Sequence, residues 1–493
     1  MRQGVTMAWI GRTPGRRLRA LLAAIGLVVT ACTVGPTYHR PSVVAPAAYK
    51  EMPGWKMAQP QDAVLRSAWW ELFQDPLLNA LAESVNISNQ TLAAAEAQVR
   101  QARAVVQAAR ASYFPTLSVG ADVSRARASA NAGSGASTGH LTLSQYSLPL
   151  DAAWEPDLWG RVRRTVESQR ATAQASVADL ESLRLSAQAA LAQSYFTLRV
   201  LDAQRDLLDV TVATYRRSLA MVQNRYTAGV ASRADVAQAE TQLKSTQTQL
   251  IDVGVQRAQL EHAIAVLIGA SVSTFSIPVA PLTLPPPAGP VGVPSALLER
   301  RPDIAGAERR VAAANAQIGV AEAAFYPNLT LSAAVGFASA AFGNWLLVPS
   351  RVWALGAAIS ETVFDGGLRK AVTEEARAAY DATVASYRQT VLTAFQDVED
   401  NLAALRILED EARVQDEAVH AARQALTVVL NQYQAGTLSY LDVVVTQTTA
   451  LANERAAVDI YGRRMTAAVL LIKALGGGWD ASALGAPTAG GAS

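Results

Sequence analysis

The chain has 493 residues, enough for several ordinary domains or one elongated one, with a net charge of +2 and 17% charged residues. This balance creates no strong electrostatic field, which argues against nucleic acid as a partner. The four histidines are scattered, and the CxxC, HExxH and P-loop patterns do not occur, so we expect neither a metal site nor a cofactor. The one cysteine, Cys32, excludes an intrachain disulfide.

A targeting segment is predicted at residues 1–31. Several arginines precede an apolar run, ALLAAIGLVVTA at 20–31, which is too short to span a bilayer and is typical of a secretory signal. The run ends in Val29-Thr30-Ala31-Cys32, which resembles the lipobox of bacterial lipoproteins, where small residues let the peptidase approach the backbone. Cys32 is therefore the expected lipidation site, with a buried structural cysteine as the alternative. Residues 32–76 are expected to form an extended, lipid-anchored equatorial segment.

Four segments read as strands, because Thr, Ser, Gly and Ala alternate with Leu, Val, Ile and Phe. Such strands can turn one face to lipid and the other to a water-filled lumen. No other apolar run reaches the length of a membrane-spanning helix, so a membrane crossing would have to use these strands. Four strands cannot close a barrel alone: either the chain oligomerises or they form an ordinary sheet outside lipid. The segments are Pro115–Ala126, Leu141–Trp154, Pro327–Ser339 and Val352–Val363.

Two long helices are the clearest expected elements. Apolar or small side chains recur every three or four positions from Tyr195 to Tyr226 and from Val384 to Tyr433. This period indicates coiled-coil-like packing. Helices over about 164–226 and 368–434 would each be roughly 95–100 Å long. A tube or stalk needs helices of that length, whereas a compact globule does not.

The turn after each long helix is nearly the same sequence. NRYTAGVASRADV at 224–236 recurs as NQYQAGTLSYLDV at 431–443, 207 positions downstream. Gly229 and Gly436 fit left-handed helix C-caps. Ser232 with Asp235, and Ser439 with Asp442, fit an S-x-x-D variant of the capping box that opens the next helix. Helix capping is therefore the first role expected for these side chains.

Further recurrences at nearly the same offset predict a two-fold internal repeat. Each half should contain a short helix, two strands, a long helix, a turn and a further helix. The first repeat is expected at 77–269 and the second at 303–475, joined by a Pro-rich equatorial linker at 270–302 and followed by a flexible tail at 476–493. The matching stretches are ASYFPTLSV at 111–119 with AAFYPNLTL at 323–331, and PDLWGRV at 156–162 with FDGGLRK at 364–370.

One enzyme-like motif is present. Residues 135–139 fit the G-x-S-x-G pattern and His140 follows, but a nucleophile elbow needs a strand before the motif and a helix after it. This match falls in a Gly/Ser-rich loop between two expected strands. We therefore expect no catalytic residue. Arg300, Arg301 and Asp303, at a linker-to-helix boundary, are expected to have a structural role.

The sequence resembles the outer-membrane factors of Gram-negative tripartite efflux systems, and more specifically their lipoprotein branch. The resemblance covers nearly the whole mature chain, and the stretch at 297–331 is highly specific in length and order. Thr33, after the lipobox cysteine, is compatible with outer-membrane sorting. The segments that carry the resemblance are CTVGPTYHRP at 32–41, WWELFQDPLLNALAESV at 69–85, WEPDLWGRVRR at 154–164, LLERRPDIAGAERRVAAANAQIGVAEAAFYPNLTL at 297–331, FDGGLR at 364–369 and both turns.

This resemblance implies a mainly α fold with membrane β structure. Three chains would each contribute four strands to a twelve-stranded outer-membrane β-barrel, and the long helices would form a periplasmic α-barrel. The homotrimer would be a passive exit duct for small molecules, working with a periplasmic adaptor and an inner-membrane transporter of the resistance-nodulation-division type. The alternatives are an export duct for type I protein secretion and a lipid-anchored coiled-coil scaffold without a pore.

The resemblance also assigns roles to the turns. Gly229, Ser232, Asp235, Gly436, Ser439 and Asp442 would lie at the periplasmic tip, where adaptor hairpins dock. Leu441, Asp442 and Val445 are the candidate gate, as rings of carboxylates or of apolar side chains around the trimer axis. Family members often carry a second Asp where this chain has Val445. Because the two turns differ mainly at Arg233-Ala234 against Tyr440-Leu441, the second turn is the better candidate for the gate.

Overall fold

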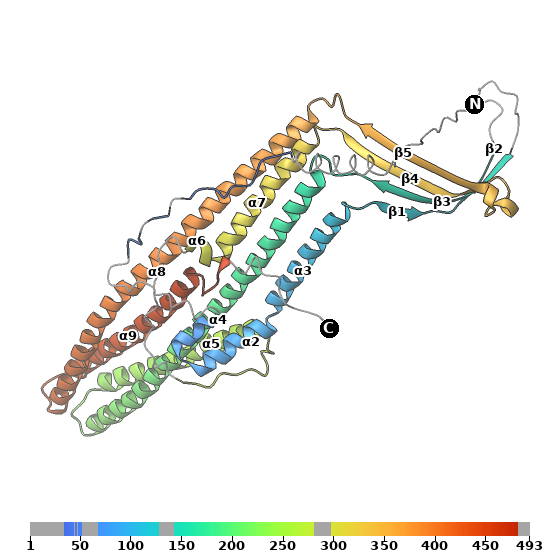
Figure 1. Cartoon of the computed structure of the whole chain (residues 1–493). Coiled ribbons are helices and arrows are strands. Elements are labelled where there is room, and N and C mark those ends of the chain that lie inside the picture. Colours follow the sequence, from blue (N-terminus) through green and yellow to red (C-terminus); the bar gives the residue numbers. More distant parts are fainter. Residues whose placement is uncertain are drawn as a thin grey trace, which may run out of the picture. The chain divides into compact units, whose positions relative to one another are not determined.

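The computed structural model describes residues 34–43, 45–46, 48–51, 68–127, 142–280 and 297–481 (Figure 1). The predicted signal peptide, Cys32 and the motif at 135–140 lie outside these ranges. The chain divides into two compact units, which are described separately. Unit 1 comprises Met1–Pro41, Gln101–Ala173 and Arg309–Val384, and unit 2 comprises Ser42–Arg100, Gln174–Glu308 and Ala385–Ser493.

Helices form most of the described chain. The bounds of α8 and α9 each lie 207 residues after the matching bounds of α4 and α5. The α-helices are α2 Pro76–Ser88, α3 Gln90–Ala111, α4 Arg161–Thr227, α5 Arg233–Leu267, α6 Leu297–Arg300, α7 Pro302–Ala323, α8 Leu368–Gln434 and α9 Tyr440–Ala474, and a 3-10 helix, η2 Trp69–Phe73, precedes α2.

The predicted period of the long helices is confirmed by their buried stripes. Each helix has 67 residues and is therefore about 100 Å long. The buried positions are three, four or seven residues apart, as in coiled-coil packing. Tyr226, at the end of the predicted stripe, is exposed instead. Buried positions include Leu198, Leu201, Leu208, Val212, Tyr215 and Val222 in α4, and Tyr387, Val391, Ala394, Val398, Leu402 and Leu405 in α8.

The strands form one antiparallel sheet in unit 1. Both β1 and β2 pair with β3, β3 pairs with β4, and β4 pairs with β5, so β1/β2 and β5 are the two edges. The strands are β1 Thr116–Val119, β2 Asp122–Arg127, β3 Thr142–Trp154, β4 Asn328–Ser339 and β5 Arg351–Ser360.

The strand predicted at Pro115–Ala126 was wrong in one respect, because it is divided into β1 and β2. The division lies at Gly120, opposite Pro149 of β3. Gly120 donates its N–H to the Pro149 carbonyl at 3.0 Å. Pro149 has no N–H to return, so the ladder is interrupted there. The fourth strand also ends earlier than predicted, at Ser360 rather than Val363.

The predicted flexible tail also begins too early. Residues 476–481 pack within unit 2 rather than forming part of a tail. Gly476, at φ 93°, donates to Lys473, and Gly477 donates to Ile472 at 3.0 Å, which ends α9. A Cβ on Gly476 would collide with the carbonyl of Arg300. The glycines therefore permit close packing here, although in sequence they suggested flexibility.

Candidate functional site

The first turn connects α4 to α5 through a Schellman motif. Gly229 donates to the carbonyl of Tyr226 at 2.9 Å, and Val230 donates to that of Arg225 at 2.8 Å. Gly229 has φ 77°, a left-handed conformation that costs a residue with a Cβ roughly 1–2 kcal/mol. The predicted C-cap role of this glycine is confirmed.

The second turn repeats this geometry between α8 and α9. Gly436, at φ 80°, donates to Tyr433, and Thr437 donates to Gln432, both at 3.0 Å. Each donor lies 207 residues after its counterpart in the first turn. The same backbone conformation therefore connects the two helices of each hairpin.

The Ser and Asp of each turn hold the start of the following helix. Ser232 donates its N–H to Asp235 Oδ2 at 2.8 Å, and its Oγ accepts from the Asp235 N–H at 3.1 Å. In the second turn, the N–H and the hydroxyl of Ser439 both donate to Asp442 Oδ2, at 3.1 and 2.7 Å. The predicted capping pairs are therefore present, although the second Ser uses its hydroxyl as a donor.

A shared core brings the two hairpins together. Val222 of α4, Ala239 of α5, Tyr433 of α8, and Tyr440 and Val443 of α9 form one buried cluster. The rings of the two tyrosines meet edge to face, with centroids 5.4 Å apart. Burial raises the pKa of Tyr433 and raises that of Tyr440 to about 12. The hairpins are thus joined by packing at the level of their turns.

Arg225 forms an additional polar contact between the same hairpins. It belongs to the last turn of α4, and its Nη1 donates to the carbonyls of Tyr433 at 3.1 Å and Gln434 at 3.4 Å. Its guanidinium also lies 4.8 Å from the centroid of the Tyr433 ring. A cation at the C-terminal end of α8 interacts favourably with the helix dipole. The repeated turn gave no signal for Arg225, because Gln432 stands at the matching place in the second copy.

The candidate gate residues lie on the exposed side of the second hairpin. Leu441 is 52% exposed and Val445 is 57% exposed, one helical turn apart on α9, while Val443 between them is buried. Asp442 is exposed and its Oδ2 is occupied by Ser439. The matching positions in the first hairpin are Ala234 and Gln238. The second turn therefore presents an apolar pair that the first lacks.

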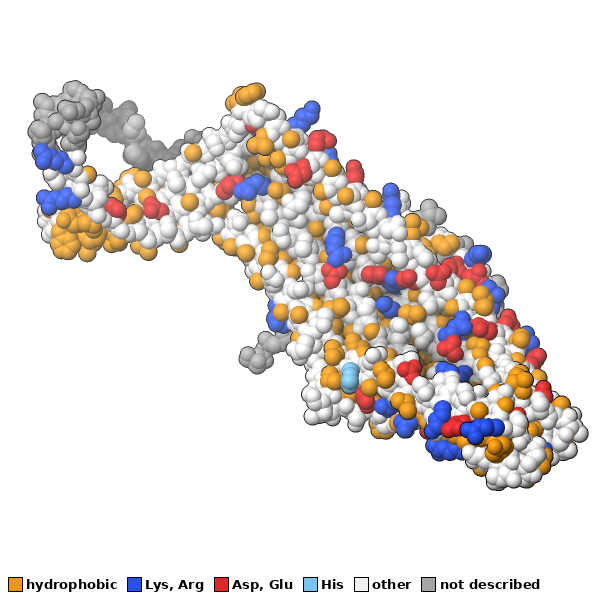
Figure 2. Space-filling view, turned by 180° about the vertical axis from the view of Figure 1, so that it is seen from behind, with side chains coloured by type: hydrophobic (Ala, Val, Ile, Leu, Met, Phe, Trp, Pro, Cys, Tyr) orange, Lys and Arg blue, Asp and Glu red, His pale blue; other side chains and the backbone are white. Residues whose placement is uncertain are grey.

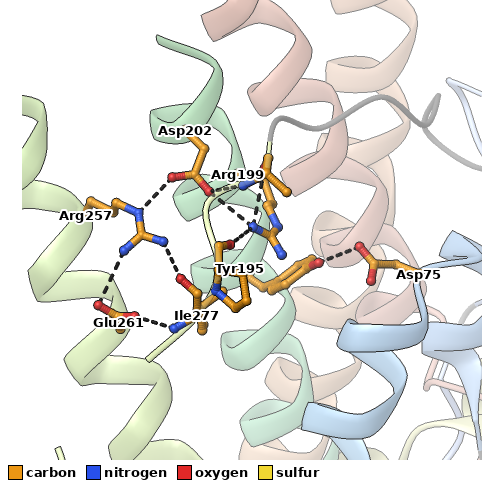
Figure 3. A network of polar contacts seen from close by, with 9 residues as sticks. Asp75, Tyr195, Arg199, Asp202, Arg257, Glu261 and Ile277 are labelled. Atoms are coloured by element: carbon orange, nitrogen blue, oxygen red, sulfur yellow. Dashed lines mark hydrogen bonds and ion pairs between the residues drawn. The ribbon is translucent and has the colours of Figure 1, made fainter. Parts of the chain in front are cut away.

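A second group of interactions holds the beginning of the Pro-rich linker (Figure 3). Asp202 of α4 is fully buried and accepts from Arg199 at 3.1 Å, from Arg257 of α5 at 2.7 Å and from the N–H of Ala280 at 3.2 Å. Arg257 also donates to the carbonyl of Ile277 at 2.6 Å. This network fixes residues 277–280 against α4 and α5. In the sequence, this network could have been found from Arg199 and Asp202, a charged pair three residues apart within an otherwise apolar stripe.

Neighbouring contacts extend this arrangement within unit 2. Tyr195, which lies 4.9 Å from the Arg199 guanidinium, donates its hydroxyl to Asp75 Oδ2 at 2.5 Å. Asp75 in turn caps α2 by accepting from Leu77 at 2.9 Å. Burial and this hydrogen bond raise the pKa of Tyr195 well above its usual range. The linker, α2 and α4 are therefore connected through polar side chains.

The predicted structural role of Arg301 also has a contact to support it. Its Nη2 donates to Asp303 at 2.7 Å, and its Nη1 donates to Asp397 of α8 at 3.0 Å. On α8, Glu399 accepts from the backbone N–H groups of Lys50 and Glu51, at 2.7 and 3.0 Å. The same long helix, α8, thus contacts both the end of the linker and the N-terminal segment.

The described ranges hold neither a candidate metal centre nor a candidate membrane-spanning helix. They contain no group of three or more His, Cys, Asp or Glu side chains placed to hold a metal ion. Within the same ranges, none of the helices combines the length and apolar character needed to cross a membrane.

The pattern of the family Outer membrane efflux protein matches residues 81–270 and 293–477, which together make up most of the chain. The chain belongs to this family. The first matched segment contains α4 and α5 and the second contains α8 and α9, and the interval between them falls within the residues predicted as the Pro-rich linker.

Named relatives support the same assignment. The chain is 31% identical over 461 residues to the toluene efflux pump outer membrane protein TtgC of Pseudomonas putida, covering 93% of this chain and 95% of that protein. It is 31% identical to the pyoverdine export outer membrane protein OpmQ of Pseudomonas aeruginosa, covering 93% and 96%. The protein is thus the outer-membrane exit duct of a tripartite efflux pump.

Solved structures share the fold. The outer-membrane channel OprN superposes with a TM-score of 0.85 at 31% identity, covering 91% of this chain and all of that chain. The open-state MtrE channel of Neisseria gonorrhoeae superposes with a TM-score of 0.79 at 29% identity, covering 91% and 99%. The mostly helical architecture with a small sheet is therefore that of outer-membrane channels.

Proposed function

We propose that the chain works as a homotrimer whose sheets close into one twelve-stranded barrel in the outer membrane. The supporting observation is that the edge strands of the sheet are exposed in a single chain. The residues of β1, β2 and β5 are exposed along their full length, so both edges are uncovered. Open edges are not tolerated in lipid and favour pairing with another chain. Three copies joined edge to edge remove every open edge.

The two faces of the sheet suit this assembly. The strand register places Leu150, Val335 and Trp353 on one face, and Asp151, Ser147 and Ser332 on the other. An apolar face meets hydrocarbon, while a polar face lines a water-filled lumen. Helices α3, α4, α7 and α8 all adjoin the same end of the sheet, so we assign that end to the periplasm.

A disulfide scan tests this edge pairing. Cysteine replaces Val123 on the β2 edge and, in turn, Trp353, Leu355 or Ala357 on β5, in a chain that keeps Cys32 for lipidation. At least one pair should give a covalent trimer on oxidation. Cysteines at Leu150 and Val335, which are partners within the chain, should give only monomers on denaturing gels. Failure of all edge pairs while that control forms its bond would contradict the barrel.

Cys32 is proposed to carry the lipid anchor. Val34 donates to the carbonyl of Trp159 at 3.2 Å, and Arg164 donates to Val34 and Gly35 at 3.1 and 3.0 Å. These contacts hold the chain beside the segment joining β3 to α4. Cys32 precedes Val34 by two residues in the sequence. The anchor would thus enter the leaflet at the periplasmic end of the sheet. Intact mass should show acylation that Cys32→Ala abolishes.

The two turns are proposed to form the periplasmic tip, where the adaptor docks. Three chains with two turns each would present six similar turns around the channel mouth. Exposed apolar side chains at the first turn, Tyr226 and Val230, give an adaptor surface to bury. Adding a charge there with Val230→Asp should weaken adaptor binding at least tenfold. Val105→Asp, an exposed change on α3, should not weaken it.

Leu441 and Val445 are proposed as the gate. Three copies of an exposed apolar pair can form a dry constriction, which conducts only when it widens. Leu441→Ser with Val445→Ser should raise the conductance of the isolated channel. Matched serine changes at Ala234 and Gln238 should leave it unchanged. Asp442 is proposed first as a cap, because its Oδ2 already accepts two bonds from Ser439.

The proposed cargo is a small molecule delivered by an adaptor and a transporter of the resistance-nodulation-division type. The relatives are named for toluene efflux and pyoverdine export, which differ widely in chemistry. A duct that serves both classes needs no specific substrate pocket. Deleting the gene should raise susceptibility to apolar toxic compounds, and the Cys32→Ala form should restore less resistance than the wild type.

A further inference from the structure

The connection between β4 and β5 is ordered and yet apolar. Residues 340–350, AAFGNWLLVPS, contain no charged side chain and are called the apolar connection below. They include the 3-10 helices η4 Phe342–Asn344 and η5 Val348–Ser350. An exposed apolar surface of this kind marks a contact with another molecule or with a membrane. The large apolar side chains that are more than half exposed are Phe342 at 69%, Leu346 at 61%, Leu347 at 52% and Val348 at 66%.

The backbone of the apolar connection forms its own hydrogen bonds. Asn344 donates to the carbonyl of Ala341 and Leu347 donates to that of Asn344, both at 3.2 Å. The hydroxyl of Ser350 also donates to the Asn344 carbonyl, at 2.7 Å, which joins the two 3-10 turns. Peptide groups that are bonded to one another need no water, and a segment in contact with lipid has to meet this condition.

The apolar connection leans over the apolar face of the sheet. The strand register places Tyr146 of β3 on the same face as Leu148 and Phe337. Tyr146 contacts Phe342 and Trp345 of the connection, with ring centroids 5.6 and 5.8 Å away. Figure 2 shows hydrophobic side chains gathered at this end of the sheet, remote from the helices. The polar face, which lines the lumen of the proposed barrel, is on the other side of the sheet, so the connection bends outward.

A second aromatic group marks the opposite end of the same face. Trp154, the last residue of β3, shares the face of Tyr146, and its Nε1 donates to the carbonyl of Tyr113 at 3.0 Å. Tyr146 and Trp154 are eight residues apart, which is about 27 Å along the strand and about 20 Å across a membrane for a strand tilted by about 40°. Aromatic girdles flank an apolar band about 25 Å tall in outer-membrane barrels. The two aromatic groups therefore have the spacing of the two membrane interfaces.

We propose that the apolar connection inserts into the outer leaflet of the outer membrane, where acyl chains meet headgroups. The inference rests on the proposed barrel. Lipid is the occupant because the connection continues the sheet face that already meets hydrocarbon in that barrel. Tyr146 and Trp345 suit this level, since their rings are apolar and their tips are polar. Arg351, the first residue of β5, lies on the same face, and its long stem lets the guanidinium extend to the headgroups.

Three copies would surround the barrel with three lipid anchors, none of them over its mouth. Depth-dependent fluorescence quenching tests this. A nitrobenzoxadiazole probe is attached to Leu347→Cys in a chain that keeps Cys32, whose thiol the proposed acylation blocks. The labelled trimer is placed in bilayers of phosphatidylcholine that carries a nitroxide either near the headgroup or near the end of the acyl chain. The nitroxide near the headgroup should quench this probe at least threefold more than the deeper one.

Two neighbouring positions on β5 calibrate the measurement. The register places Leu355 on the apolar face and Ala354 on the polar face. A probe on Leu355→Cys should be quenched by the deeper nitroxide, and a probe on Ala354→Cys should be quenched by neither. Because the two positions differ by one residue, this contrast reports which face meets lipid.

Substitutions within the apolar connection test what holds it in the leaflet. Val348→Asp should reduce quenching at Leu347→Cys at least threefold while trimers form and conduct normally, because a carboxylate is costly to bury among acyl chains. Asn344→Asp, which adds a charge at an exposed and already polar position, is the control and should leave the quenching unchanged.

The same probes separate the proposal from the barrel on which it rests. Quenching at Leu355→Cys without quenching at Leu347→Cys would overturn the proposal. Emission from Leu347→Cys at short wavelength without lipid quenching would also overturn it, since protein rather than lipid would then cover the connection. An unquenched Leu355→Cys would instead refute the barrel itself.

Discussion

The guanidinium of Arg225, at the end of α4, donates to the carbonyl of Tyr433, at the end of α8, over 3.1 Å. This contact links the first hairpin to the second, in addition to the buried cluster that they share. In the proposed trimer, opening the tip requires hairpins to separate. Arg225 is therefore the polar contact whose loss should most directly favour opening.

Arg225→Gln is expected to increase the conductance of the isolated channel. A hydrogen bond from a charged donor contributes about 1.5–3 kcal/mol, and partial exposure reduces this to about 1 kcal/mol. That corresponds to about a fivefold change in the ratio of open to closed tips. Planar-bilayer recording measures it. Arg217→Gln is the control, because Arg217 donates to Thr214 on its own helix. Equal conductance of the two variants would show that the Arg225–Tyr433 contact does not keep the tip closed.

Asp202→Asn is expected to destabilise the protein strongly. The substitution leaves Arg199 and Arg257, whose side chains are 6% and 13% exposed, without their buried counter-charge. Breaking a buried pair costs about 3–5 kcal/mol. Thermal unfolding of the purified protein checks this, together with protease sensitivity of the linker after Ile277. Asp209→Asn, on the exposed side of α4, should change stability by no more than about 0.5 kcal/mol. A similar effect of both changes would rule out the proposed role of the network.

The turn glycines are expected to be required for their backbone conformation alone. A Cβ at Gly229 would meet nothing within 4 Å, so Gly229→Ala should cost about 1 kcal/mol through its φ of 77°. Gly229→Asn should cost less, because Asn tolerates the left-handed region. Gly254→Ala, in the interior of α5 with equally open surroundings, should stabilise by about 0.5–1 kcal/mol. Chemical unfolding distinguishes these signs, and a destabilising Gly254→Ala would contradict the reasoning.

Stability of the tip is expected to fall at alkaline pH. Burial raises the pKa of Tyr440 to about 12 from an ordinary value of 10.0. The folded state then retains a proton that the unfolded state loses, so stability is complete below pH 10 and declines towards pH 12. Two pKa units correspond to about 2–3 kcal/mol. Tyr440→Phe should flatten the decline in thermal stability over this interval. The smaller decline that remains would come from Tyr433, whose pKa burial also raises. An unchanged slope would mean that Tyr440 does not titrate in this way.

Much of the helical architecture could be predicted from the sequence, because it depends on local and periodic signals. The 207-residue offset predicted matching turns, and the apolar period predicted the long helices to within a few residues. The alternation of apolar and polar residues predicted that the strands exist. The division between β1 and β2, however, depends on Pro149, which lies opposite Gly120 in β3. That information lies in the register rather than in the local pattern.

The contacts of the candidate site were less accessible from sequence. The capping pairs at both turns were predictable because Ser and Asp act within four residues. Arg225 and Asp202 act across 208 and 55 residues, to α8 and α5 respectively. Which helix faces them is decided by tertiary packing, which no short motif encodes. Gly476 was misread for the same reason, since the neighbour that requires glycine is Arg300.

Reconstitution of the purified, acylated protein into planar bilayers tests the central claim most directly. The account predicts a heat-modifiable trimer on gels that inserts as one conducting unit, with a low conductance that Arg225→Gln increases. A monomer that sediments with soluble periplasmic proteins, or a trimer that gives no conductance in either the wild-type or the Arg225→Gln form, would contradict it.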